Sequence, residues 1–124
     1  RSAALQPVIT TGAVAEISEL LTTVHTDPAV LRYTAQLAEA TRNDPSTRLG
    51  VSVRGMLAMI RVAKVWAATE RRTYVLPDDI KALAVPVWEH RLVMDPEAEF
   101  SGVTPNSVIA RALADIAAPQ ARVA

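Results

Sequence analysis

One short segment, residues 50–55, combines side chains that could bind an anion. Ser52 is a good N-cap residue, so the sequence predicts a helix that begins at this serine. Arg54 then falls in the first turn of the helix, where unpaired backbone N–H groups already concentrate partial positive charge. A cation is disfavoured at that place unless an anion lies beside it. A phosphate group would accept hydrogen bonds from the N–H groups and from the planar guanidinium fork together.

Two interpretations of Arg54 are open at this level. In the first, Arg54 is a solvent-exposed arginine that pairs with a nearby acid. In the second, it binds a phosphate group. Helical spacing places Arg61 and Arg72 near the same line as Arg54, which predicts a basic stripe on an otherwise apolar helix. Such a stripe is either solvated or faces an acidic or phosphate-bearing neighbour.

The chain carries no complete catalytic or metal-binding motif. No segment matches the phosphate-binding pattern G-x-x-x-x-G-K-[ST], so we expect this chain alone not to hydrolyse ATP. The segment "GVSVR" lacks the last glycine of the serine-hydrolase elbow, because Arg54 occupies that position. His25 and His90 have no second ligand three or four residues away, and the chain has no cysteine. We therefore predict no metal site.

Composition excludes further classes of function. The 124 residues include 13 basic and 13 acidic side chains, so no global field attracts nucleic acid or an anionic membrane surface. Apolar residues make up 50% of the chain, but no apolar run is long enough to span a bilayer. We expect neither nucleic acid nor membrane as a partner. The length is that of one domain, and the start at Arg1 suggests a segment of a longer protein.

Apolar residues recur at helical spacing in five segments, which predicts a mostly α, compact helical bundle. The predicted helices cover residues 11–23, 27–42, 52–70, 77–85 and 105–117. Pro86 is expected to kink or end the fourth helix. Residues 73–76 and 91–94 are rich in β-branched or aromatic side chains and are candidates for a small two-stranded ribbon.

Two of the predicted helices have a marked apolar pattern. The first helix has an apolar stripe formed by Val14, Ile17, Leu20, Leu21 and Val24. The long third helix is apolar over more than half of its circumference, which is typical of a central helix. Trp66 and Trp88 are most simply explained as core or interdomain residues.

Residues 48–104 resemble the C-terminal lid domain of MoxR-family AAA+ ATPases, which are relatives of the magnesium-chelatase ATPase subunit. The matching features are the glycine-x-serine-x-arginine helix start and the segments "YVLPDDIKALA" and "HRLVMDPEAEFSGV". The resemblance continues upstream through "VITTGAVAEISELL" and "LAEATRND". Val53, Gly55 and Leu76 differ from the usual family pattern, which has proline, a small alanine-like residue and threonine at these places.

The resemblance implies a role for three residues of this chain. Arg54 would be the sensor-2 residue, which reaches the γ-phosphate of ATP bound to the preceding α/β domain. Ser52 would hold the helix start, and an apolar wall around Tyr33 would lie beside the adenine. On this interpretation residues 1–10 are a linker from the upstream ATPase domain, 11–118 are the lid and 119–124 are a frayed tail.

The resemblance also implies properties of the complete protein. These are ATP with Mg²⁺ as cofactor, assembly into a homo-oligomeric ring, a cytoplasmic location, and chaperone-like maturation of client proteins. Proteins of the von Willebrand factor A type are implied partners. The alternative is an all-α protein-interaction module with no nucleotide role, which binds a partner through the basic stripe or exposed tryptophans. A Walker A segment upstream in the complete reading frame would distinguish the two.

Overall fold

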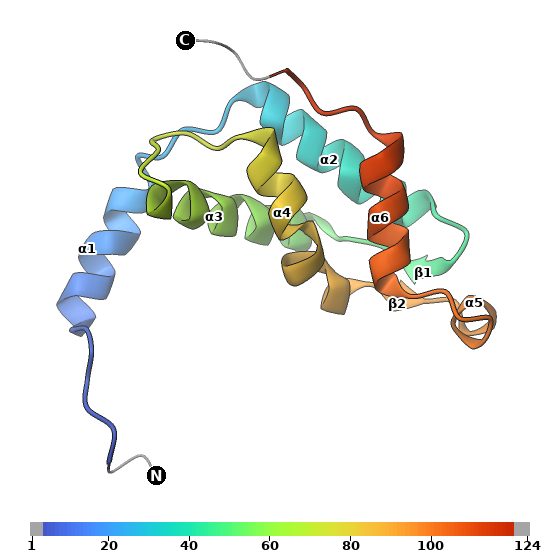
Figure 1. Cartoon of the computed structure of the whole chain (residues 1–124), viewed down its shortest axis with the longest axis horizontal. Helices are drawn as coiled ribbons and strands as arrows, with labels where there is room; N and C mark the ends of the chain where they lie inside the picture. Colours follow the sequence, from blue (N-terminus) through green and yellow to red (C-terminus); the bar gives the residue numbers. More distant parts are fainter. Residues whose placement is uncertain (1–3, 121–124) are drawn as a thin grey trace.

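The structure of the protein is a computed structural model that describes residues 4–120. Its helices and strands follow in the order α1 (Thr11–Leu21), α2 (Pro28–Asn43), β1 (Thr47–Leu49), α3 (Val53–Thr69), α4 (Pro77–Trp88), the 3₁₀ helix η2 (Glu89–Arg91), β2 (Val93–Met94), α5 (Pro96–Phe100) and α6 (Pro105–Asp115). The predicted mostly α fold is confirmed (Figure 1). Within residues 4–120, no helix combines the length and the apolarity needed to cross a membrane.

Capping side chains set the starts of four helices. In each, the side-chain oxygen of the N-cap residue accepts a hydrogen bond from a backbone N–H of the first turn. The caps are Thr10, Asp27, Ser52 and Thr104. All five predicted helices are present, with starts within one residue of the prediction and ends within three residues. The short helix α5 was not predicted, because its five residues are too few to show a helical apolar period.

Of the two predicted effects of Pro86, a kink or an end of the helix, the second is wrong. Helix α4 continues past this proline to Trp88, which is buried. The indole Nε1 of Trp88 donates a hydrogen bond to the carbonyl oxygen of Gly55, 3.0 Å away on α3. Tertiary packing of the last turn against α3 therefore compensates for the backbone hydrogen bond that the proline removes.

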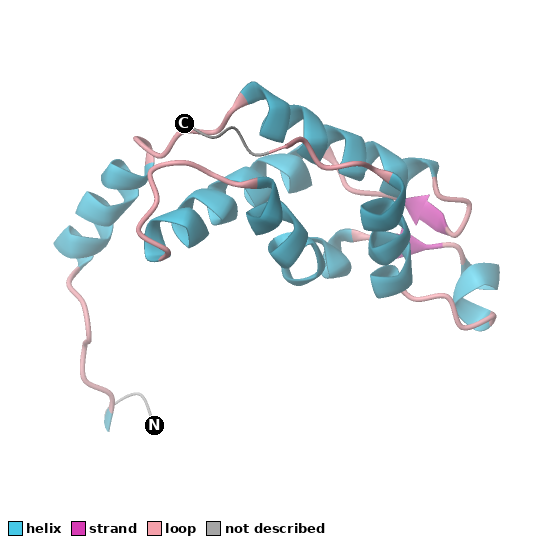
Figure 2. Ribbon diagram, turned by 45° about the horizontal axis from the view of Figure 1, so that its top comes forward, coloured by secondary structure: helices cyan, strands magenta, loops and turns pink. Residues whose placement is uncertain are grey.

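The predicted partners of the ribbon were also wrong. Strand β2 pairs antiparallel with β1 (Figure 2). Tyr74 instead forms a single parallel bridge with His25. The helices explain this pairing. Because α3 and α4 pack against each other with the start of α3 beside the end of α4, the segment before α3 meets the segment after α4. Residues 73–76 lie at the opposite end of α3.

The core lies between α2, α3, α4 and α6, and its buried side chains come from all four helices. The largest of them are Tyr33, Leu37, Met59, Ile80, Trp88 and Ile109. The chain enters α3 by passing close to the last turn of α2, at Gly50. A Cβ atom on Gly50 would lie 2.4 Å from the backbone nitrogen of Arg42, so this approach requires glycine.

Helix α1 contacts this core only at its C-terminal end, through the partly buried residue Leu21. No residue of α1 is buried, and Val14, Ile17 and Leu20 are 48%, 47% and 67% exposed. Figure 1 shows α1 at one end of the molecule, away from α6. The amphipathic pattern predicted the helix correctly, but of its apolar stripe only Leu21 and Val24, at the C-terminal end, pack against the core, while Val14, Ile17 and Leu20 stay exposed.

The C-terminus of α3 contains an unusual backbone conformation. Arg71 has a φ of 60°, in the left-handed region. The N–H groups of Arg71 and Arg72 donate to the carbonyl oxygens of Ala68 and Ala67, which is the hydrogen-bond pattern of a Schellman motif. Glycine is the preferred residue at this position, since a Cβ atom is strained there.

We therefore expect Arg71→Gly to raise the free energy of unfolding by about 1 kcal/mol. Arg71→Ala is the matched control: it removes the same side chain but keeps the strained Cβ atom, so it should change stability by less than about 0.5 kcal/mol. Chemical denaturation of the three proteins gives the comparison. A glycine variant no more stable than the alanine variant would contradict the strain at this position.

Candidate functional site

The start of α3 has the geometry that the sequence predicts. Ser52 is extended, and its Oγ accepts a hydrogen bond from the backbone N–H of Gly55 at 3.2 Å. The first turn contains no acidic residue. Because the first N–H groups of a helix have no intrahelical acceptor, those of Val53 and Arg54 remain available to a ligand.

Arg54 is the second residue of α3, and its side chain is exposed. It makes no hydrogen bond or ion pair with any residue between 4 and 120, so the described part of the chain does not supply the nearby acid that the first interpretation requires. A guanidinium without a partner thus stands beside the positive end of a helix dipole.

The predicted basic stripe was wrong, because Arg72 lies beyond the end of α3. Its Nη2 and Nη1 atoms donate to the two carboxylate oxygens of Asp79, at 2.6 and 2.8 Å. Nη1 also donates to the carbonyl oxygen of Tyr74 at 3.0 Å. The hydrogen bonds that Arg72 donates to Asp79 raise the pKa of Arg72, against the opposing effect of burial. Of the predicted stripe, only Arg54 and Arg61 are exposed residues of α3.

Three side chains hold the start of α3 against the rest of the bundle. Arg42 of α2 donates from Nη1 to the carbonyl oxygen of Val51 at 2.7 Å. Trp88 donates to the carbonyl oxygen of Gly55, so the prediction that this tryptophan is a core residue is confirmed. Arg91 of η2 reaches the same turn: its Cδ atom lies 3.4 Å from the position that a Cβ atom on Gly55 would occupy. The site is therefore built from α2, α3, α4 and η2.

Gly55 is a close-packed residue in this structure. A Cβ atom there would lie 2.8 Å from the Cγ1 atom of the buried residue Val51 and would also meet the side chain of Arg91. The glycine that replaces the alanine-like residue of the family pattern therefore makes room for these two neighbours. No signal in the sequence indicates this requirement.

Tyr33 lies inside the core. Its side chain is 1% exposed, and its hydroxyl group has no hydrogen-bond partner among the described residues. Burial, and to a lesser extent the negative charge of Asp78, raises the pKa of this hydroxyl group. The structure does not present the ring at the surface, and the role of Tyr33 beside an adenine stays a prediction.

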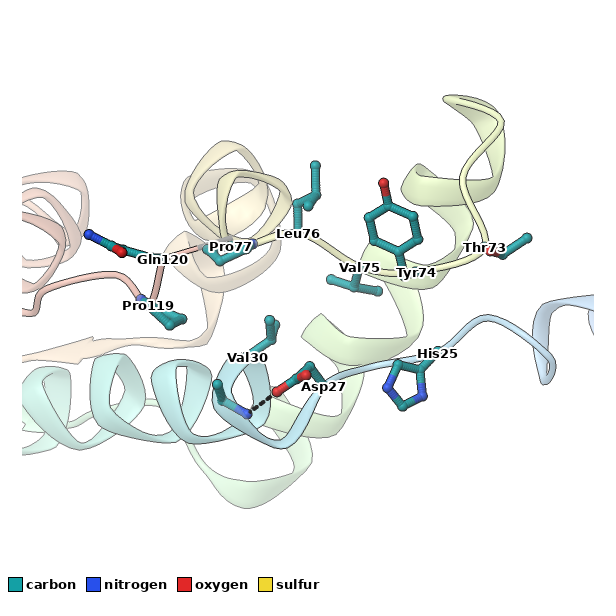
Figure 3. Close-up of a pocket in the computed structure, with 11 residues that line it drawn as sticks. His25, Asp27, Val30, Thr73, Tyr74, Val75, Leu76, Pro77, Pro119 and Gln120 are labelled. Atoms are coloured by element: carbon teal, nitrogen blue, oxygen red, sulfur yellow. Dashed lines mark hydrogen bonds between the residues drawn. The ribbon is translucent and has the colours of Figure 1, made fainter. Parts of the chain in front are cut away.

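A groove that sequence reasoning missed lies at the other end of α3. It has a volume of about 430 Å³ and runs between the start of α2, the segment that leads into α4, and the C-terminal residues Pro119 and Gln120 (Figure 3). Figure 3 shows His25 and Asp27 on one side of it and residues 73–77 on the other. Since α3 has 17 residues and a length of about 25 Å, the groove is remote from Arg54.

Two polar side chains of this groove, Asp27 and His25, are candidate ligands. Asp27 already has a hydrogen-bond partner, and His25 is not part of a group of potential metal ligands among the described residues. The carboxylate of Asp27 caps α2 by accepting the N–H of Ala29 at 2.8 Å. His25 and His90 belong to different ends of the bundle, and no group of three or more potential metal ligands occurs among the residues that the structure describes. Pro119 lines the groove and is partly buried, while residues 121–124 of the predicted frayed tail lie outside the described residues.

Comparison with known families gives a match over more than half of the chain. Residues 39–112 match the family described as the AAA lid domain. This range includes the start of α3, the Arg72–Asp79 pair and most of α6.

Curated proteins of three bacteria are similar to this chain. The uncharacterized protein YeaC of Bacillus subtilis is 32% identical over 95% of the chain and 37% of its own length. Protein MoxR of Paracoccus denitrificans is 39% identical over 60% of the chain and 26% of its own length. Chaperone MoxR1 of Mycobacterium tuberculosis is 30% identical over 91% of the chain and 32% of its own length.

A solved structure shares the fold. The crystal structure of a candidate ATPase from Cytophaga hutchinsonii superposes with a TM-score of 0.85 at 28% identity, over 93% of this chain and 38% of that protein. The chain thus spans between a quarter and two fifths of the length of these relatives.

Proposed function

This chain belongs to the AAA lid domain family, in the form that MoxR-family ATPases carry, and from this premise we propose that it closes over ATP bound to an α/β domain. In the proposal Arg54 is the sensor-2 residue and contacts the γ-phosphate. Ser52 holds the start of α3 in the orientation that presents Arg54. The single observation that supports this role most directly is the exposed, unpaired guanidinium of Arg54 in the first turn of a capped helix.

A phosphate group fits the residues at this helix start. The N–H groups of Val53 and Arg54 lack intrahelical acceptors, and no acid in the first turn competes for the guanidinium. When bound there, a phosphate would receive charge-assisted hydrogen bonds from the side chain and the favourable potential of the helix dipole. Arg54 would stabilise the negative charge that develops on the phosphate during hydrolysis. No residue of the described chain is assigned to Mg²⁺, which the α/β domain would hold.

The exposed apolar residues of α1 and α3 support a contact with a further domain. Val14, Ile17 and Leu20 on α1 and Trp66 on α3 are between 42% and 67% exposed. Water-exposed apolar groups of this size in one region are typical of an interaction surface. We propose that the ATPase domain covers them, with residues 1–10 as the linker, 11–118 as the lid and 119–124 as a tail.

Further proposals concern the complete protein, because this chain spans only 37% of the length of YeaC and 32% of the length of MoxR1. We propose that it hydrolyses ATP with Mg²⁺, assembles as a homo-oligomeric ring in the cytoplasm, and acts in chaperone-like maturation of client proteins. The similarity to Chaperone MoxR1 supports the last of these. Partner proteins of the von Willebrand factor A type are part of the same proposal.

The reading frame that encodes the chain provides a direct test. We expect it to encode a G-x-x-x-x-G-K-[ST] segment upstream of Arg1, and we expect the complete protein to bind ATP. A reading frame without such a segment, or a complete protein that does not bind nucleotide, would favour the alternative of a helical protein-interaction module.

A further inference from the structure

We infer that Thr41 and Arg42 are positioning residues for Arg54. They belong to the last turn of α2 and hold the backbone of Val51, and through Val51 they fix the place of the first turn of α3. This inference rests on the proposed function, because it assigns two residues that orient the arginine of that site. Neither of them contacts the nucleotide, so both act through Arg54.

Both polar backbone groups of Val51 are bound by side chains of α2. The N–H group of Val51 donates to Oγ1 of Thr41 at 3.0 Å, and its carbonyl oxygen accepts from Nη1 of Arg42 at 2.7 Å. Val51 is fully buried, so water does not replace either partner. Because a buried backbone group without a hydrogen bond is unfavourable, loss of either side chain favours a shift of Val51 toward water.

The two side chains that hold Val51 are themselves fixed in place. Thr41 is fully buried, and its Oγ1 donates to the carbonyl oxygen of Ala38 at 2.6 Å while it accepts from Val51. The chain passes Arg42 so closely that a Cβ atom on Gly50 would lie 2.7 Å from Cγ of Arg42. Two consecutive residues of α2 thus determine where the segment before α3 lies.

Val51 connects α2 to the turn that carries Arg54. It directly precedes the N-cap residue Ser52, and Arg54 follows three positions after Val51. The side chain of Val51 also packs over Gly55, where a Cβ atom would lie 2.8 Å from its Cγ1 atom. Because the hydrogen bond between Ser52 and Gly55 closes this turn, a shift of Val51 moves the turn and Arg54 together.

The test compares variants of the complete protein that carries this chain. Arg42→Met keeps the aliphatic stem and removes the donor to Val51. Because a misplacement of about 1 Å can cost on the order of 100-fold in rate, we expect Arg42→Met to lower kcat for ATP about 10- to 100-fold. ADP has no γ-phosphate, so its affinity should stay unchanged, while a non-hydrolysable ATP analogue should bind more weakly.

Arg111→Met is the matched control. Arg111 of α6 also holds the segment after α2, through Asp44 at 3.2 Å and Ser46 at 3.3 Å, but it makes no hydrogen bond with Val51. This variant should therefore keep the kcat of the unaltered protein. Thr41 provides a second pair, which decides the matter if Arg42→Met does not fold: Thr41→Val removes the acceptor and should lower kcat, whereas Thr41→Ser keeps the acceptor and should retain most of the activity.

A double-mutant cycle separates positioning from a general loss of structure. If Arg42 acts through Arg54, Arg42→Met should have no further effect on turnover once Arg54 is replaced by alanine. The inference is overturned if Arg42→Met lowers turnover equally in both backgrounds, or if it weakens binding of ADP and of the ATP analogue alike. It is also overturned if Arg42→Met and Thr41→Val keep normal kcat while Arg54→Ala does not, a result that leaves the proposed function intact. Normal turnover in Arg54→Ala would overturn the inference and the proposed function together.

Discussion

Replacing Arg54 by alanine should reduce ATP turnover of the complete protein roughly 100- to 1,000-fold, the usual cost of losing one preorganised donor to developing charge. Arg54 is exposed and makes no hydrogen bond or ion pair with residues 4–120, so its removal breaks no polar contact within the described part of the lid. It also removes a cation from the positive end of a helix and introduces a better helix former. The free energy of unfolding should therefore change by no more than about 0.5 kcal/mol.

Turnover and thermal melting of the same preparations test this separation of function from folding. Arg54→Lys keeps the charge without the bidentate fork and should give intermediate turnover. Arg61→Ala removes an exposed arginine from the same helix and is expected to retain turnover. Unaltered turnover in Arg54→Ala would return this residue to the interpretation of a merely solvated arginine, and so would a loss of activity explained by unfolding.

The largest expected effect on stability follows from Arg72→Ala, which should lower the free energy of unfolding by about 3 kcal/mol. The change leaves the carboxylate of Asp79 without its bidentate partner, although that side chain is only 5% exposed. Asp79 also accepts the backbone N–H of Leu76 at 2.7 Å, which fixes the start of α4. Loss of the arginine therefore weakens the turn between α3 and α4 as well as the ion pair.

Chemical denaturation of this chain gives the measurement. Lys81→Ala is the control, because Lys81 pairs with Asp78 on the same helix at 3.9 Å with both side chains well exposed. Exposed pairs contribute little, so this variant should lose less than about 0.5 kcal/mol. Arg72→Lys should fall between the two. A similar loss from Arg72→Ala and Lys81→Ala would show that the Arg72–Asp79 pair does not stabilise the fold.

The sequence by itself determined the helices and their starts. Helix caps act over three residues or fewer, as the hydrogen bond from Gly55 to Ser52 shows, so local residue types are sufficient to predict them. The same locality explains why the residue types around Ser52 are enough to assign Arg54 to a first turn. The helix ends were predicted less accurately, because tertiary contacts decide where a helix ends. Helix α4 continues past Pro86 to Trp88, which donates a hydrogen bond to Gly55 on α3.

Tertiary structure alone decided which elements meet and which faces are covered. The strand that pairs with β2 depends on the packing of α3 against α4. Arg72 is not part of the predicted basic stripe, because α3 ends at Thr69. The apolar stripe of the first predicted helix is continuous in the sequence, yet only Leu21 and Val24 at its end pack against the core, while Val14, Ile17 and Leu20 are exposed. The approach of Arg91 to Gly55 joins residues far apart in the chain. A periodic pattern shows that a surface is apolar or charged, but only the three-dimensional arrangement of the helices determines what lies against it.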